Sequence, residues 1–228
     1  MLVLNAAEVF QALPMSEAIG AMKRAMRALS GEHANIPLRT HIDVAAGTTL
    51  VMPGHVKDPQ GEALAVKVVS IFNRNRQQRG LDNILGIVNV LDPQTGQPIA
   101  VLDGAAVTAL RTAATSGAAT DELARSDASH LAIIGSGTQA HSHYLAMCAV
   151  RPVQSAVFFA PNRSRLEKLI ATIESPVEIK IADCPQEATS QADIICTSTN
   201  SITPVIEEGA VQAGCHIIAI GSYKPDVV

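Results

Sequence analysis

Three basic residues occupy segments in which a positive charge needs an explanation. Lys67 lies inside the apolar run Ala65–Ile71, Arg39 lies in the run Pro37–Val44, and Arg111 lies among small residues. A lysine in an apolar strand is rarely buried without a partner, and an arginine can bind both oxygens of a carboxylate at once. Together the three residues are candidates for holding a substrate carboxylate. The alternatives are an edge-strand lysine that prevents aggregation and arginines in surface salt bridges.

A glycine-rich turn is the second candidate for chemistry. The apolar run Leu131–Ile134 is followed by Gly-x-Gly-x-x-Ala over Gly135–Ala140, and then by the helical pattern His141–Val150. This order is typical of a dinucleotide-binding unit, in which the glycines permit a tight turn and a close approach to the pyrophosphate. Free N–H groups at the start of the helix bind the phosphates. The alternative is a plain tight turn. The predicted cofactor-binding residues of this loop are Gly135, Gly137, Thr138, Gln139 and Ala140.

The ribose end of the cofactor site is predicted at the segment Phe158–Arg163. An NAD-selecting carboxylate is expected about 20 residues after the glycines, but this segment has none. Asn162, Arg163 and Arg165 suit the 2′-phosphate of NADP instead. The sequence therefore favours NADP mildly over NAD, unless these residues only begin a helix.

Composition excludes several other functions. The seven histidines and four cysteines show no metal-ligand spacing and no C-x-x-C pair. The net charge of −4, the 3% aromatic content and the lack of a basic run argue against nucleic acid as the main partner. Asn5, Glu8 and Gln11 interrupt the apolar start, so it is not a signal peptide, and no apolar run is long enough to span a membrane. We expect a cytoplasmic protein.

The first half, residues 1–112, is predicted to be a β-rich α+β domain for substrate binding and dimerisation. Its first helix runs from Ala6 to Leu13 with Asn5 and Glu8 in a capping arrangement, and Ser16 is expected to cap a second helix. A Pro-Gly turn is expected to end the second strand. The predicted strands are Pro37–Val44, Thr49–Gly54, Ala63–Phe72 and the hairpin Gly86–Leu91 with Pro98–Leu102.

The second half, residues 113–228, is predicted to be a Rossmann-type domain with a parallel sheet, which makes the fold class α/β. A helix over Gly104–Thr120 leads into it, and another covers Ser164–Ile173. We expect the three cations to meet in a cleft between the halves. The sequence ends soon after the last strand, so we expect a shorter version of a longer protein. The predicted strands are Leu131–Ile134, Ala156–Ala160, Val177–Ile181, Asp193–Thr197 and His216–Ile220.

These pieces, in this order, resemble the ornithine cyclodeaminase/mu-crystallin family over nearly the whole chain. The Thr108–Thr112 motif followed by the glycine loop is the most specific part of the resemblance. Family members pair a β-rich domain with a Rossmann domain, run longer, and return their last helices to the first domain. The matching segments are Pro37–His41, Met52-Pro53, Val66–Ser70, Asp103-Gly104, Thr108–Thr112, Gly135–Ala140, Thr197–Thr199 and Ala219–Pro225.

The resemblance implies roles for individual residues. Arg39, Lys67 and Arg111 match the family's substrate-carboxylate residues, and Lys67 is also the candidate catalytic proton donor. Thr112 and Thr197 join the predicted cofactor-binding set, together with Asn162 and Arg163. Cyclodeaminases carry an aspartate shortly after the last strand. Tyr223 stands there in this chain, with Asp226 three residues beyond.

The implied function is an NAD(P)-dependent oxidoreductase that transfers a hydride to or from a small 2-imino or 2-amino acid. Ketimine reductases and amino acid dehydrogenases are of this type. The alternatives are an ornithine cyclodeaminase, a mu-crystallin-like protein that holds NADPH and a ligand without turnover, and a truncated inactive product. The expected partners are a small-molecule substrate and a second copy of the chain in a homodimer.

Overall fold

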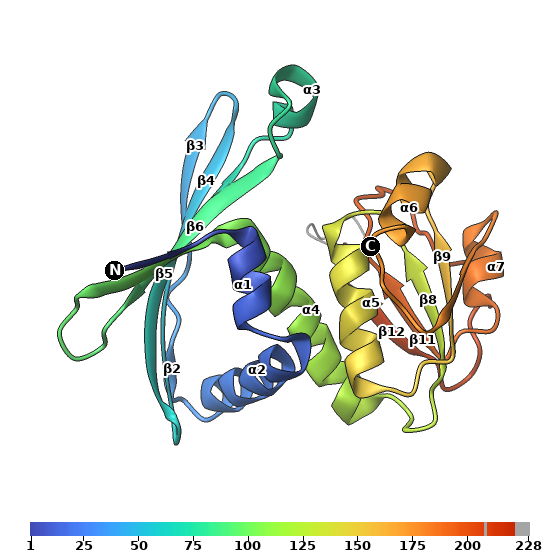
Figure 1. The fold of residues 1–228 in the computed structure, drawn as a ribbon, viewed down its shortest axis with the longest axis horizontal. Helices are drawn as coiled ribbons and strands as arrows, with labels where there is room; N and C mark the ends of the chain where they lie inside the picture. Colours follow the sequence, from blue (N-terminus) through green and yellow to red (C-terminus); the bar gives the residue numbers. More distant parts are fainter. Residues whose placement is uncertain (208, 222–228) are drawn as a thin grey trace. The chain divides into compact units, whose positions relative to one another are not determined.

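The computed structural model describes residues 1–207 and 209–221, and the chain divides into two compact units, Met1–Arg111 and Thr112–Val228 (Figure 1). Helix α4 (Gly104–Leu123) contributes residues to both units. The fold belongs to the α/β class that the sequence predicts. No helix within the described residues is both long and apolar enough to cross a membrane.

The first unit is built on a seven-stranded sheet in the order β1-β7-β6-β5-β4-β2, with β3 also paired to β4. The β1–β7 pair is parallel, and the other pairs are antiparallel. Strand β5 lies inside the sheet, because β4 and β6 pair with its two sides. The strands are β1 (Leu2–Leu4), β2 (Ala34–Asn35), β3 (Thr40–Val44), β4 (Gly47–Asp58), β5 (Gly61–Ile71), β6 (Ile84–Leu91) and β7 (Pro98–Asp103).

The helices of this unit before α4 are α1 (Ala6–Ala12), α2 (Met15–Ser30) and the short α3 (Asn75–Arg79). The predicted capping box of α1 is confirmed: Asn5 Oδ1 accepts from the Glu8 N–H at 3.1 Å, and Glu8 Oε2 accepts from the Asn5 N–H at 2.8 Å. The predicted Ser16 cap is wrong. Helix α2 begins at Met15, after Pro14, so Ser16 already lies inside its first turn.

Strand β4 does not end at Pro53-Gly54 as predicted. On one side β4 pairs with β5 throughout, while on the other side β3 pairs only with residues 47–51 and β2 only with residues 55–56. The Pro-Gly pair lies in the gap between β3 and β2, where neither strand needs a donor from proline. A strand can therefore continue through a residue that lacks an N–H group.

The second unit contains a five-stranded sheet in the order β10-β9-β8-β11-β12, and every pair is parallel. This is the strand order of a Rossmann sheet, whose ligand site lies where the order reverses, between the first and fourth strands. Here these strands are β8 and β11. The strands are β8 (His130–Ile134), β9 (Ser155–Phe159), β10 (Glu178–Ile181), β11 (Ile194–Thr197) and β12 (His216–Ala219).

Helices cover both faces of this sheet (Figure 1). They are α5 (Thr138–Val150), α6 (Arg163–Ile170) and the short α7 (Pro185–Thr189). The Tyr144 ring of α5 packs against the Phe158 ring with centroids 5.9 Å apart. The neighbouring Val157 and Phe159 point the other way and pack in the cluster that contains Ala188 of α7. Alternate residues of β9 thus pack into two separate hydrophobic cores.

Candidate functional site

Lys67 lies on the interior strand β5, so the edge-strand alternative is wrong. Its cross-strand neighbours are Met52 on β4 and Val88 on β6. Directly paired residues share a face of the sheet, and Val88 is buried. The side chain of Lys67 therefore rises from an apolar surface. Its Nζ donates a hydrogen bond to Thr108 Oγ1 over 3.4 Å.

The start of helix α4 is fitted closely to the neighbouring strand. A Cβ added to Gly104 would lie 2.6 Å from the carbonyl carbon of Gly86, so only glycine permits this approach. The Asp103 carboxylate accepts from the Ala106 N–H at 2.7 Å and secures the first turn. One turn later, Thr108 faces Lys67. Arg111 lies three residues beyond Thr108, on the same side of the helix.

The three predicted cations act on one another electrostatically within the first unit. Burial, then Arg111, then Arg39 lowers the pKa of Lys67 to about 8. Burial and then Arg39 also lower the pKa of Arg111. Arg39 lies just before β3, which begins at Thr40 and not at the predicted Pro37. Contrary to our expectation, the group does not need both halves of the chain to form. Such a group of positive charges suits a bound anion, because its negative charge would compensate for the water that burial removes from the cations.

The glycine loop follows β8 and meets the residue after β11, at the point where the strand order reverses. Gly135 has a φ of +145°, and an added Cβ would lie 2.5 Å from Ser198 Oγ and 2.6 Å from the Ser198 carbonyl oxygen. The Ser198 N–H in turn donates to the Ile134 carbonyl at 2.8 Å. Only glycine fits this turn, which brings two strand ends together.

Gly137 differs from Gly135 in its surroundings, because it lies at the start of a helix and no backbone atom of the described residues packs closely against it. It is the N-cap of α5, and the nearest atom to an added Cβ would be Arg165 Nη2 at 3.8 Å. No side chain caps α5, and Gln139 Oε1 is buried without a hydrogen-bond partner within the described residues. Ala140 is fully buried, as close packing requires. The lack of any close contact from the described part of the chain at the Gly137 backbone, a helix start without a side-chain cap and an unpaired polar atom fit a dinucleotide pyrophosphate.

The predicted ribose residues have local structural roles. Asn162 caps α6 by accepting from the Arg165 N–H at 2.9 Å. Arg163 forms ion pairs with Asp183 at 2.7 Å and Glu167 at 3.4 Å. Contact of Asn162 and Arg163 with a cofactor stays a prediction.

The remaining predicted residues are placed as follows. Thr197 ends β11 opposite Ile134, and Thr112 lies on α4. Tyr223 and Asp226 lie outside the described residues. Sequence reasoning missed the contacts of Thr108 and Ser198. The spacing of Thr108 to Arg111 and the polar residues after β11 were the available signals.

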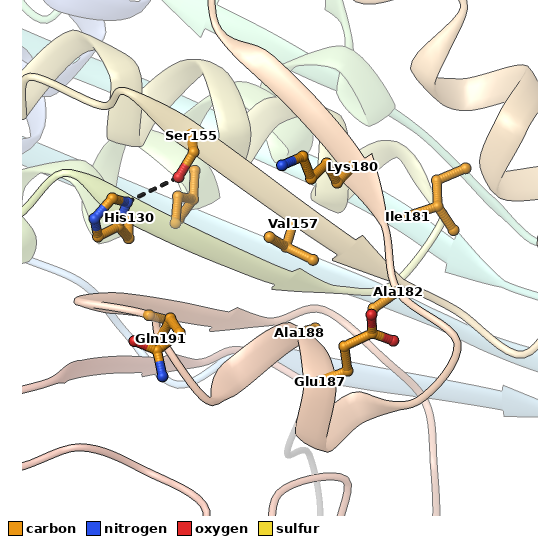
Figure 2. Close-up of a pocket in the computed structure, with 11 residues that line it drawn as sticks. His130, Ser155, Val157, Lys180, Ile181, Ala182, Glu187, Ala188 and Gln191 are labelled. Atoms are coloured by element: carbon orange, nitrogen blue, oxygen red, sulfur yellow. Dashed lines mark hydrogen bonds between the residues drawn. The ribbon is translucent and has the colours of Figure 1, made fainter.

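The second unit also has a hollow of about 610 Å³ on the α7 face of its sheet (Figure 2), and no residue of the glycine loop is among those that line it. Val157 of β9 lies among the residues of its wall, with Lys180, Glu187 and Gln191 around it. At one end, His130 Nδ1 and Ser155 Oγ are hydrogen-bonded at 2.8 Å. Both residues begin their strands, whereas the glycine loop follows a strand end. The hollow is therefore separate from the predicted cofactor site.

Comparison with known proteins agrees with this geometry. The chain is 38% identical over 234 residues to a delta(1)-pyrroline-2-carboxylate reductase of Bacillus cereus, with 100% of this chain and 70% of the reductase covered. The structure of the Thermococcus litoralis delta(1)-pyrroline-2-carboxylate reductase in complex with NADH and L-proline matches with a TM-score of 0.88 and 37% identity, over 96% of this chain and 68% of that chain.

An archaeal alanine dehydrogenase dimer with bound NAD matches with a TM-score of 0.86 and 28% identity, over 95% of this chain and 66% of that chain. The family model for the ornithine cyclodeaminase/mu-crystallin family matches residues 1–228. The resemblance first seen in the cation segments and the glycine loop is thereby confirmed. This chain belongs to the ornithine cyclodeaminase/mu-crystallin family.

Proposed function

We propose that the protein is an NAD(P)H-dependent reductase of small cyclic 2-imino acids, of the pyrroline-2-carboxylate reductase type. The observation that carries the proposal is the group formed by Lys67, Arg111 and Arg39, whose charges act on one another in the first unit. The 38% identity to a Bacillus cereus pyrroline-2-carboxylate reductase supports the substrate class.

Each cation has a proposed role. Arg39 and Arg111 bind the substrate carboxylate, because two guanidinium groups offer paired donors in a fixed plane. Lys67 holds a proton for the imine nitrogen. A pKa of about 8 leaves it protonated at neutral pH and still able to give the proton up.

The cofactor site is proposed at the glycine loop. Gly135, Gly137, Thr138, Gln139 and Ala140 would lie along the pyrophosphate, with Thr112 and Thr197 nearby. A bound NAD(P)H supplies the hydride that reduces the imine carbon. The mild preference for NADP remains part of the proposal. The guanidinium of Arg165 near the Gly137 backbone supports it, in addition to Asn162 and Arg163.

We also propose a homodimer and a cytoplasmic location. One face of the first unit's sheet exposes several large apolar side chains, which a second copy of the chain could cover. The dimeric alanine dehydrogenase is consistent with this. The exposed residues of that face are Val3, Ile42, Val44, Leu85, Ile87 and Ile99.

The test is oxidation of NADH and of NADPH by the protein, followed by absorbance. Pyrroline-2-carboxylate and piperideine-2-carboxylate are the expected substrates. Pyruvate with ammonia or methylamine tests the dehydrogenase reaction, and ornithine tests cyclodeamination. Turnover of the cyclic imines supports the proposal. Release of ammonia from ornithine without turnover of any imine would overturn it in favour of the cyclodeaminase.

A further inference from the structure

The amine of Lys67 lies close to two other positive charges, a position that electrostatic repulsion disfavours. The side chains of Arg111 and Arg39 repel its positive charge, and a lysine has a long flexible stem that can turn toward water. Some specific contact must therefore keep the amine next to the arginines. Within the described residues, the hydrogen bond to Thr108 Oγ1 at 3.4 Å is the only one that Lys67 Nζ makes.

The hydroxyl of Thr108 has a fixed orientation. Its proton is donated to the Gly104 carbonyl one turn earlier, at 2.7 Å. The lone pairs on Oγ1 are therefore turned away from that carbonyl and toward Lys67. Because the hydroxyl proton is already committed, Thr108 acts as an acceptor toward the amine, which must donate. The contact is at the long end of the range for a hydrogen bond, as contacts in substrate-free sites often are.

We propose that Thr108 is a positioning residue for Lys67, which it holds at the face of α4 that also carries Arg111. The threonine is not a catalytic residue, since nothing places it at the reacting atoms. Its catalytic consequence rests on the proposed function, in which Lys67 gives a proton to the imine nitrogen. Its structural consequence, which is where the Lys67 amine lies, is independent of the proposed function.

The other groups around Lys67 leave Thr108 as the determining contact. The cross-strand neighbours Met52 and Val88 have no charge, and neither side chain has an oxygen that could accept from the amine. Asp103 pairs with Ile87, which pairs with Val68, so Asp103 belongs to the opposite face of the sheet from Lys67. Loss of the Thr108 hydroxyl would therefore leave two repelling arginines and an apolar surface, from which the amine should turn away.

The experiment compares Thr108→Val, which keeps the shape and removes the hydroxyl, with Thr108→Ser, which keeps the hydroxyl. Thr172→Val is the matched control, because the Thr172 hydroxyl also donates to a carbonyl of its own segment, that of Leu169 at 2.7 Å, but does not contact Lys67. If Thr108→Val does not fold, Thr108→Ala removes the same hydroxyl with a smaller side chain.

The first readout is kinetic. We expect Thr108→Val to lower kcat of imine reduction about tenfold or more, with KM changed less than twofold, and the alkaline limb of the kcat/KM profile to move upward in pH. Thr108→Ser should restore kcat and the pH profile. A kcat and a pH profile unchanged in Thr108→Val would overturn the proposal.

The second readout does not depend on activity. NMR of isotope-labelled lysine side chains gives the pKa of Lys67, with Lys67→Met used to identify its signal. A rise of this pKa in Thr108→Val, absent in Thr172→Val, supports the positioning role even if no imine is reduced. In that case the proposed function fails and the positioning role stands. An unchanged pKa means that Thr108 does not hold the amine.

Discussion

At the scale of single residues, the candidate substrate site is held together against its own charge. The positive charges of Arg111 and Arg39 act on the partly buried amine of Lys67, and such opposition is typical of functional sites that give up stability for binding. Within the group, Lys67 Nζ donates a hydrogen bond to Thr108 Oγ1, and the neighbours of Lys67 across the strands, Met52 and Val88, are apolar. The positive charges that repel one another and so lower the stability of the protein should together attract the carboxylate of a substrate strongly.

Lys67→Met should therefore stabilise the protein at pH 7. Burial and the arginines lower the pKa of Lys67 from 10.5 to about 8, so the unfolded chain binds more protons than the folded one between these values. Stability then rises with pH across this window, and the penalty is complete below it. After allowance for solvent screening, we expect a gain of about 1 kcal/mol at pH 7.

Thermal unfolding at pH 7 and at pH 10.5 measures this gain, which should be absent at the higher pH because Lys67 is then neutral in the wild-type protein. Lys168→Met, at an exposed position on α6, is the control. A Lys67→Met variant that is less stable than wild type at pH 7 would show that the hydrogen bond to Thr108 outweighs the cost of burial and the repulsion by the arginines.

Arg111→Ala should weaken substrate binding and leave cofactor binding unchanged. Removal of a bidentate partner from a bound carboxylate costs about 1–3 kcal/mol, or roughly 5- to 150-fold in KM. Steady-state kinetics measures KM, and NADPH fluorescence titration measures cofactor affinity. Arg79→Ala, at the exposed end of α3, is the control. An unchanged KM would mean that Arg111 does not contact the substrate.

At the scale of elements, the two glycines of the loop should respond differently to the same substitution. Gly135→Ala forces a Cβ to within 2.5 Å of Ser198 Oγ at a φ of +145°, so it should lower the thermal unfolding temperature. Gly137→Ala meets only Arg165 at 3.8 Å, at a φ of −104°. It should fold normally but bind NADH and NADPH more weakly. Equal cofactor affinities for Gly137→Ala and wild type would contradict a pyrophosphate at this backbone.

The C-terminal end of α4 depends on one buried arginine. Arg151 donates to the carbonyls of Asp121 at 3.1 Å and Ala124 at 2.8 Å, and its side chain is 7% exposed. The last carbonyls of a helix have no N–H partner within the helix. Arg151→Leu should cost roughly 3 kcal/mol, because it leaves these acceptors unpaired. Arg151→Lys should recover little, since an ammonium cannot span both carbonyls. Chemical denaturation measures both, and full stability in Arg151→Lys would contradict the capping role.

Local sequence patterns predicted that helices, strands and turns exist better than they predicted the residues at which each one begins and ends. The Asn5–Glu8 capping box and the glycine loop are encoded within a few residues, so the sequence alone identified them. The continuation of β4 through Pro53 depends on a gap between β3 and β2, which only the sheet order reveals. Ser16 has the residue type of a cap, but Pro14 had already set where α2 begins.

At the scale of the whole chain, the second unit was easier to predict than the first. Its parallel strands alternate with helices, and such a pattern admits few topologies. The first unit is mostly antiparallel, and nothing local to Lys67 says that β5 lies inside the sheet. That position excludes the edge-strand interpretation and leaves Lys67 as a candidate functional residue. The convergence of Arg39, Lys67 and Arg111 likewise depends on contacts between residues far apart in sequence.

The apolar face of the first unit's sheet gives the last prediction. Ile87 is paired with Val68, which pairs in turn with Val51, and directly paired residues share a face. Ile87 is 46% exposed. A charge placed in the middle of an apolar interface has no partner and costs several kcal/mol per subunit. Ile87→Asp should therefore convert a dimer into a monomer without unfolding the chain.

Light scattering after size-exclusion chromatography measures the mass, and circular dichroism checks the fold. The control is Ile202→Asp, which changes an isoleucine that is 77% exposed in the second unit and should leave the mass unchanged. A dimeric Ile87→Asp variant would place the interface elsewhere. A monomeric wild-type protein would mean that something other than a second copy covers this apolar face, since soluble proteins rarely leave a large apolar patch in contact with water.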